Sequence, residues 1–386
     1  MSTAITVPRG LNGVEVTETS IGHVLGDIGV YHYRGRPAAS LARDHDVSFE
    51  AACALVLDGV DAGEMARAAG TMTSALAAAR ADAALAVSSG ALASTIAAIT
   101  ERINGAVGLN HLGAAVALFG AERGMRPMLD ATEQQRRADA IAIIGALPVL
   151  VAALAGHDVS AMIDGAPPSR HAQAYLAALV EREPAAADVR ALEEYLILTI
   201  DHGFNASTFT GRVVASTGAD LAAVVSAAMA ALSGPLHGGA PSRALDALDA
   251  IGSPERARQW VIDEIAAGRR VMGFGHAVYR TTDPRSTHLK QLARRIGGEQ
   301  AAKAIAIETA ITETLAELKP DNKLYANVEF YAGVVMAACG VPRALFTATF
   351  AVSRVVGWCA HALEQGREAK LIRPSARYVG PPLLDD

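Results

Sequence analysis

Three short segments place residues capable of acid–base chemistry among glycines and apolar residues. Glu329 lies in ANVEFYAG, His237 in SGPLHGGAPS and His276 in VMGFGHAVYRTTDPR. A carboxylate that is partly removed from water suits a general base, and a histidine suits a general acid or a hydrogen-bond donor. The three segments together make a candidate site for proton transfer.

Each of these residues also has a plainer interpretation. Glu329, Gly333 and Met336 share one helical face, so the acid is either tolerated at the surface or held as a base beside the space above Gly333. A single histidine is more often structural, but the glycines around His237 let a ligand approach the backbone closely. His276 follows GFG without the third glycine of a dinucleotide fingerprint, so it is either a polar loop residue or a donor to a carbonyl.

Four arginines and one more histidine could bind an anion. Arginine suits carboxylates and phosphates because its planar guanidinium donates two parallel hydrogen bonds, although a single arginine on a helix is usually solvated. A metal site is not expected, since HExxH, clustered Cys/His spacing and an EF-hand loop are all missing. The candidate anion ligands are His202 in DHGFNAST, Arg280 and Arg285 in HAVYRTTDPR, Arg354 in FAVSRVVGW and Arg373 in LIRPSARY.

The composition indicates a helical scaffold for these residues. The 386 residues allow two domains or one large one, and 51% hydrophobic but only 5% aromatic residues favour close-packed helices of Ala, Val, Leu and Ile. A net charge of −6 with no basic run does not suggest a nucleic-acid partner. The long uncharged runs contain Gly, Pro or Ser-Ser-Gly, which favours buried helices over membrane spans. Three scattered cysteines, 53, 339 and 359, fit a reduced, cytoplasmic setting.

The pattern of apolar residues predicts an all-α fold with a small β-structure within residues 12–40. Ser48 should cap the first long helix because it precedes an apolar-periodic run. Further helices are predicted over 72–87, 91–104, 112–123, 133–154, 170–182, 187–201, 205–217, 219–232, 241–250, 255–267, 286–296, 299–318, 328–339 and 343–364. Strand signals are missing between them, so a βαβ architecture is not expected.

Taken in order, these segments resemble the citrate synthase family. The resemblance covers most of residues 10–41 and nearly all of 196–381, and six ordered motifs are far more specific than a single GxG. The motifs are GLNGVEVTETSIG with YRGR, DHGFNAST, SGPLHGG, MGFGHAVYRTTDPR, LYANVEFYAG, and FTATFAVSRVVGWCAHALEQ followed by IRPSARYVGP.

The resemblance implies a homodimer in which each chain has two helical domains. The large domain would comprise residues 1–237 and 341–386, and the small domain residues 238–340. The active site would lie in the cleft between them, and closure of the small domain would exclude water. No cofactor would be bound permanently, because acetyl-CoA serves as a co-substrate.

The resemblance also implies a role for each candidate residue. Glu329 would remove a methyl proton from acetyl-CoA while His237 donates to the thioester oxygen, and His276 would polarise and protonate the oxaloacetate carbonyl. The oxaloacetate carboxylates would be bound by His202, Arg285, Arg354 and, from the other subunit, Arg373. CoA would be bound by Val271, Met272, Gly273, Gly275, Arg280 and Asn327.

The chain departs from the family at the proposed base. The family usually has Asp in place of Glu329 and Pro in place of Ala326. The extra methylene moves the carboxylate by about 1.5 Å, and a misplacement of about 1 Å can lower a rate on the order of a hundredfold. We therefore expect the helix carrying Glu329 to sit slightly further back. Gly203 likewise replaces an acid beside His202.

Three alternatives to citrate synthase remain open on the sequence. A 2-methylcitrate synthase would use the same residues with propionyl-CoA, and one extra methylene discriminates by only about 1–3 kcal/mol. A catalytically weakened paralogue could instead bind CoA esters or dicarboxylates. A purely structural helical scaffold would require all six motifs to coincide by chance.

Overall fold

The computed structural model describes residues 7–11, 13–163, 169–180, 183–235, 237, 241–276, 278–320, 323–368 and 370–381, and for 241–243 the backbone only. Helices dominate these ranges, which confirms the predicted all-α class. They are α1 (Ala38–Arg43), α2 (Phe49–Asp58), α3 (Met65–Ala86), α4 (Gly90–Ile103), α5 (Leu109–Glu122), α6 (Glu133–Leu154), α7 (His171–Val180), α8 (Ala186–Thr199), α9 (Ala206–Ser216), α10 (Leu221–Leu232), α11 (Pro241–Ile251), α12 (Pro254–Ala266), α13 (Pro284–Ile296), α14 (Gly298–Leu318), α15 (Val328–Ala338) and α16 (Phe346–Glu368).

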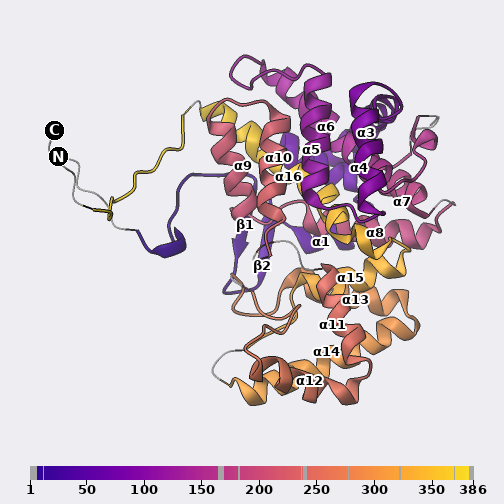
Figure 1. The fold of residues 1–386 in the computed structure, drawn as a ribbon, viewed down its shortest axis with the longest axis vertical. Coiled ribbons are helices and arrows are strands. Elements are labelled where there is room, and N and C mark those ends of the chain that lie inside the picture. Colours follow the sequence, from indigo (N-terminus) through magenta and orange to yellow (C-terminus); the bar gives the residue numbers. More distant parts are fainter. Residues whose placement is uncertain are drawn as a thin grey trace.

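The helices form two groups in space (Figure 1). The small group, α11–α15, gathers at one end of the molecule, and the large group contains the remaining helices. The N-terminal and C-terminal stretches both extend away from the large group on the same side of the molecule. The sequence between α10 and α11 joins the two groups, and residues 238–240, which include the glycines after His237, lie outside the described residues.

A small antiparallel sheet is the predicted β-element. It has the order β1 (Gly22–Leu25), β2 (Val30–Tyr33) and β3 (Arg36–Pro37). The first strand-like piece, GVEVTETSIGHVLG, forms a strand only in its last part. Its earlier residues turn towards α16 instead, where the backbone N–H of Ser20 donates to Glu364 at 2.8 Å.

Local capping explains where several helices begin. Ser48 caps α2 as predicted, because its hydroxyl accepts from the backbone N–H of Ala51 at 3.2 Å. α3 begins at Met65 and not at residue 72, since Asp61 accepts from the N–H of Glu64 at 3.1 Å and starts the turn there. Gly70 inside α3 obscured this start, because glycine is unfavourable within helices.

α6 is a core helix that is apolar on most sides. Thr132 and Gln135 form a capping box at its start, and nearly all of its residues from Ala140 onward are buried. By length and composition α6 could cross a membrane, as could α3 and α4 taken as one bent span. However, 78% of the most apolar window of α6 is buried within the fold, and a core helix passes the same test.

The turn between β1 and β2 supports a loop of the small group. The backbone N–H of Arg280 donates to the carbonyl of Gly26 at 3.1 Å. A Cβ on Gly26 would lie 2.4 Å from the carbonyl oxygen of Val278, and one on Gly29 would lie 2.6 Å from Oγ1 of Thr281. The sheet therefore fixes residues 278–282 against the large group, next to His276.

Gly22 and Gly70 provide a matched pair of substitutions that tests this packing. A Cβ on Gly22 would lie 2.2 Å from Oδ2 of the buried Asp201, whereas one on Gly70 would contact nothing within 4 Å. We expect Gly22→Ala to lower the free energy of unfolding by about 1–3 kcal/mol through overpacking. Gly70→Ala should raise it by up to ~1 kcal/mol. Denaturant unfolding measures both, and equal stability of the two variants would contradict the close packing around Asp201.

Candidate active site

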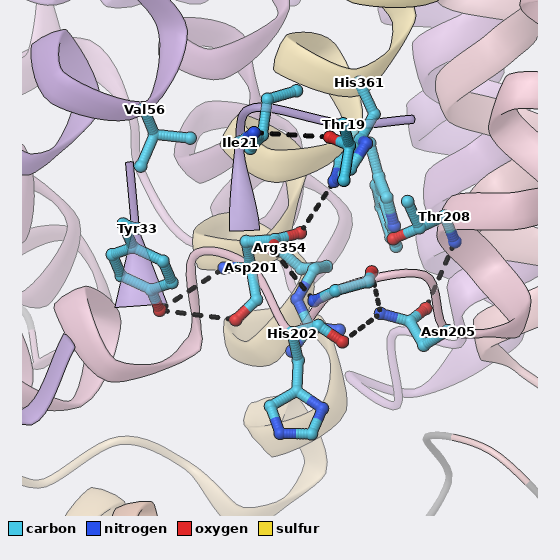
Figure 2. Close-up of polar contacts among 12 residues, drawn as sticks. Thr19, Ile21, Tyr33, Val56, Asp201, His202, Asn205, Thr208, Arg354 and His361 are labelled. Atoms are coloured by element: carbon cyan, nitrogen blue, oxygen red, sulfur yellow. Dashed lines mark hydrogen bonds and ion pairs between the residues drawn. The ribbon is translucent and has the colours of Figure 1, made fainter. Parts of the chain in front are cut away.

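The turn between α8 and α9 carries the DHGFNAS motif into the interior (Figure 2). Asn205 caps α9, because its Oδ1 accepts from the backbone N–H groups of Ser207 and Thr208 at 3.1 Å each. Asp201 and His202 are both buried. The ring of His202 points away from Asp201 in Figure 2, so the side chains of these two adjacent residues contact different parts of the protein.

His237 is held as a neutral ring by the start of α9. Its Nε2 accepts the backbone N–H of Ser207 at 3.1 Å and lies 2.9 Å from the Ser207 hydroxyl. Because Nε2 accepts, we assign the proton of the neutral ring to Nδ1. Burial, reinforced by the charge of Arg354, lowers the pKa of His237 to about 4. His237 can therefore donate a hydrogen bond through Nδ1 at neutral pH.

His276 is the opposite tautomer. Its Nδ1 accepts the backbone N–H groups of Val278 at 2.9 Å and Tyr279 at 3.2 Å, so the ring proton lies on Nε2. Burial and the charge of Arg285 lower the pKa of His276 to about 4. Nη2 of Arg285 lies 3.2 Å from this Nε2. Since both nitrogens carry protons, they can share an acceptor atom of a ligand.

His202 completes a cluster of three histidines. Its Nε2 lies 2.8 Å from the hydroxyl of Tyr279, and its ring centroid lies 5.5 Å from that of His276. Burial, followed by the charge of Arg285, lowers the pKa of His202 well below its usual value. The three histidines come from both helix groups and are all kept neutral.

Asp283 links the starts of two helices in the small group. It caps α13 by accepting from the backbone N–H of Arg285 at 2.9 Å, and it accepts from the N–H of Val328 in α15 at 3.1 Å. The same carboxylate binds the guanidinium of Arg285 at 3.0 and 2.8 Å. Asp283 therefore sets the position of Arg285 relative to Glu329, the second residue of α15.

Arg354 is a fully buried cation. Its Nε donates to the carbonyl of Thr199 at 2.8 Å, and its guanidinium carbon lies 4.6 Å from the ring centroid of Phe350. Burial lowers the pKa of Arg354, and the nearby Asp201 acts against that shift. Its Nη2 is buried and has no hydrogen-bond partner among the described residues. Because an unsatisfied buried cation is costly, an anionic ligand would complete this site.

Asp201 offsets part of this positive charge. Its Oδ2 accepts from the backbone N–H of Gly203 at 2.9 Å. Its Oδ1 lies 3.2 Å from Nε2 of His361, within ion-pair distance though not aligned as a hydrogen bond. Burial would raise the pKa of Asp201, but His361 and Arg354 lower it below its usual value. The buried aspartate therefore stays ionised.

Glu329 lies half-buried at the start of α15. Its backbone N–H donates to Oδ1 of Asn327, the capping residue, at 3.0 Å. The partial positive charge of a helix N-terminus stabilises a carboxylate in the first turn. Burial raises the pKa of Tyr195, Arg354 acts against this shift and the charge of Glu329 adds to it. The buried hydroxyl of Tyr195 has no partner among the described residues. Glu329 thus lies next to Val328, whose backbone N–H binds the carboxylate that also holds Arg285.

Residues 271–275, the loop expected to bind CoA, pair with residues 325–326, which precede α15. Phe274 and Ala326 form an antiparallel bridge, and the N–H of Gly275 donates to the carbonyl of Tyr325 at 2.9 Å. Gly273 has a φ of +81°, a left-handed conformation that glycine adopts without strain. The side chain of Asn327 donates to the carbonyl of Gly275 at 3.1 Å.

Beside this loop lies a cavity of about 340 Å³. Arg280 and Lys323 line it together with His276, Tyr279 and Asn327. The two cations make it suited to an anionic ligand. Val271 is buried and Met272 half-buried at the start of the loop, whereas Arg280 beyond it is exposed.

The structure brings most of the candidate residues together but leaves one apart. His276 lies next to both His202 and Arg285, and Arg354 and His237 are near enough for their charges to act on His202. Asp283 joins Arg285 to the start of α15, which carries Glu329. Arg373 is exposed in the extended C-terminal stretch, and this stretch runs away from the large group (Figure 1). Among the described residues, no cluster of three or more His, Cys, Asp or Glu side chains could hold a metal ion.

Four supporting residues were missed by the sequence analysis. Asp283 could have been found, because Asp before Pro at a helix start is a capping pattern. Tyr279, Ser207 and Asp201 act on the histidines through contacts between distant segments or through backbone groups. No spacing rule reveals those contacts. The fold and the site thus define an all-α protein with a histidine-lined, basic site for a small anion.

The chain belongs to the citrate synthase family, since a family model described as citrate synthase, C-terminal domain, matches residues 10–375. The citrate synthase of Deinococcus radiodurans is 30% identical over 380 residues, which cover 97% of this chain and 96% of that protein. The citrate synthase of Thermoplasma acidophilum, solved with carboxymethyl coenzyme A and oxaloacetate, has a TM-score of 0.83 and 28% identity over 98% of both chains. The fold predicted from the resemblance is therefore confirmed.

Other relatives match over a shorter part. Citrate synthase 2 of Bacillus subtilis is 41% identical over 215 residues, which cover 54% of this chain and 56% of that protein. A 2-methylcitrate synthase of Shewanella oneidensis is 36% identical over 206 residues, or 53% of this chain and 54% of that protein. The chain thus spans about half the length of these curated relatives.

Proposed function

We propose that this protein condenses acetyl-CoA with oxaloacetate and hydrolyses the resulting citryl-CoA to citrate and CoA. The observation that carries the proposal is the pair of neutral histidines of opposite tautomer, His237 and His276, together with the buried Nη2 of Arg354, which has no partner among the described residues. Such an arrangement offers two separate hydrogen-bond donors and one cation. The condensation needs the same set, because it polarises two carbonyl oxygens and binds a dianion.

Each step can be assigned to a group in the site. Glu329 takes a proton from the methyl carbon of acetyl-CoA, while Nδ1 of His237 donates to the thioester oxygen on which negative charge develops. The new carbon nucleophile attacks the carbonyl carbon of oxaloacetate. Nε2 of His276 donates to the carbonyl oxygen and protonates it as the C–C bond forms. Water then cleaves the thioester and releases CoA as a thiol.

The charges in the site support oxaloacetate as the acceptor. Arg285 is already paired with Asp283, whereas Arg354 keeps a buried nitrogen without a described partner. A dicarboxylate would satisfy Arg354 and the donors of His202, Arg285 and His276. Its negative charge would also offset the charge of Arg285, which together with burial lowers the pKa of His276.

Acyl-CoA would bind beside the small group without any permanent cofactor. The cavity lined by Arg280 and Lys323 suits the phosphates of CoA, and the backbone of 271–275 would face its adenine. We propose that residues 238–340 move as a small domain against a large domain of 1–237 and 341–386. The cleft between them would hold both substrates, and closure would exclude water.

We further propose a homodimer in a cytoplasmic setting. Arg373 belongs to the exposed C-terminal stretch, which runs away from the large group (Figure 1), as a residue donated to a partner subunit would require. The exposed Tyr378 and Val379 on the same stretch would be covered by that partner. All three cysteines are free and buried, which fits a reducing compartment.

Substitution of Glu329 tests the proposed reaction. Glu329→Gln keeps the shape of the side chain but removes the base, so kcat should fall by about 10²–10⁴-fold. KM should change little, because the base acts on the bound substrate. Release of CoA thiol from acetyl-CoA and oxaloacetate measures both constants. If wild type and Glu329→Gln release thiol at the same rate, the chain is a binding-only paralogue.

Glu329→Asp keeps the carboxylate but shortens the side chain, so it tests whether α15 is positioned for glutamate. If α15 sits further back to suit glutamate, the shorter acid loses reach and its kcat should fall on the order of a hundredfold, while activity stays measurable. An Asp variant as active as the wild type would show that the backbone is not adapted to the longer side chain.

The alternative function is that of a 2-methylcitrate synthase, which is among the relatives and differs in the acyl group of its CoA substrate. We expect kcat/KM with oxaloacetate to be higher for acetyl-CoA than for propionyl-CoA by about 10-fold or more, the range that one methylene provides. Parallel assays of the two thioesters measure this ratio. A preference for propionyl-CoA would make the protein a 2-methylcitrate synthase.

A further inference from the structure

Two adjacent glutamates on α8 have different partners although both are buried. Glu193 accepts from the backbone N–H of Phe49 at 3.1 Å and from Nη1 of Arg190 at 3.0 Å. Both partners belong to the large group. Glu193 therefore fastens α8 to the start of α2 within one group.

Glu194 instead binds two side chains of α13 in the small group. Nε2 of His288 lies 2.7 Å from its Oε2, and Nη2 of Arg295 lies 2.8 and 2.6 Å from its two oxygens. Nε of Arg190 approaches from its own helix at 3.5 Å. Burial would raise the pKa of Glu194, but His288 and Arg295 lower it below its usual value. One ionised carboxylate thus ties the two helix groups together.

The two helices joined by Glu194 lead directly to the substrate residues. Arg285 lies one turn before His288 on α13, and Asp283 caps that end. α8 ends at Thr199, whose carbonyl holds Arg354, and His202 follows three residues later. Any shift of α13 along α8 therefore changes the distance between Arg285 and the large-group ligands.

We infer that Glu194 is a positioning residue of the active site: by binding His288 and Arg295, it sets the small-group ligand Arg285 against the large-group ligands His202 and Arg354. Both oxygens of Glu194 bind side chains of α13, which are not substrate residues, so Glu194 acts on the site through α13. The kinetic consequence rests on the proposed function. The geometric consequence does not, since it concerns only how the two groups sit.

Glu194→Gln removes the charge while it keeps the size of the side chain. The amide retains one acceptor for two strong donors, and its NH₂ faces the N–H groups of Arg295 or His288. α13 then loses its fixed position. The charge that remains on Arg295 is half exposed, so water can solvate it.

Glu193→Gln is the matched control. Both substitutions neutralise a buried acid on the same helix, so both should lower the melting temperature. Only Glu194→Gln should raise KM for oxaloacetate, by about tenfold or more, whereas Glu193→Gln should leave it within about twofold. Equal KM changes in the two variants, or a change in melting temperature alone for Glu194→Gln, would overturn the inference.

Arg295→Gln tests the same contact from its exposed side. This variant should raise KM for oxaloacetate in the same direction but by less, because His288 still binds Glu194. Arg295→Gln removes a charge that is half exposed, so this variant tests the positioning role even if Glu194→Gln does not fold. An unchanged KM in Arg295→Gln would count against the inference.

A distance measurement separates this inference from the proposed function. Spin labels at the exposed positions Arg67 on α3 and Glu313 on α14 report the distance between the groups by pulsed EPR. The distribution should broaden or shift in Glu194→Gln and match wild type in Glu193→Gln. If the protein shows no turnover but the distances behave in this way, only the proposed function fails. Identical distributions in the two variants would refute the positioning role.

Discussion

The buried guanidinium of Arg354 is the interaction on which the rest of the site depends. It is anchored by Thr199 and Phe350, and its Nη2 is left without a described partner. Its charge contributes to the low pKa values of His202 and His237. A positive charge held in a nonpolar interior thus does two things at once: it prepares a place for an anion and keeps nearby imidazoles neutral.

The surrounding structure can be understood as the means of holding that charge. Asp201 stays ionised and offsets part of it, while Asp283 neutralises Arg285 in the same way from the small group. The β1–β2 turn packs on residues 278–282, which fixes the backbone N–H groups that set the tautomer of His276. Glu194 then places the two groups relative to each other. Neutral donors, paired aspartates and one cation with an unsatisfied nitrogen are the groups that the proposed binding of a dicarboxylate would use.

The sequence predicted the scaffold better than the supporting contacts. Apolar periodicity and Ser48 identified helices that the structure contains, because those features act within one helix. The start of α3 was predicted too late because of Gly70, whereas in the structure a turn held by Asp61 precedes the helix. The resemblance of the motifs identified His237, His276 and Arg354 as site residues. The charge state and tautomer of the two histidines do not follow from residue spacing. Those depend on contacts between segments far apart in the chain, such as Ser207 with His237.

The most direct test of this account is the protonation of the two donor histidines in the ligand-free protein. Long-range ¹H–¹⁵N NMR of histidine-labelled protein between pH 5 and 8, assigned with single His→Gln variants, reports charge and tautomer together. The account predicts that His237 stays neutral with its proton on Nδ1, and that His276 stays neutral with its proton on Nε2. Protonation of either ring above pH 6, or the same tautomer in both, would contradict it.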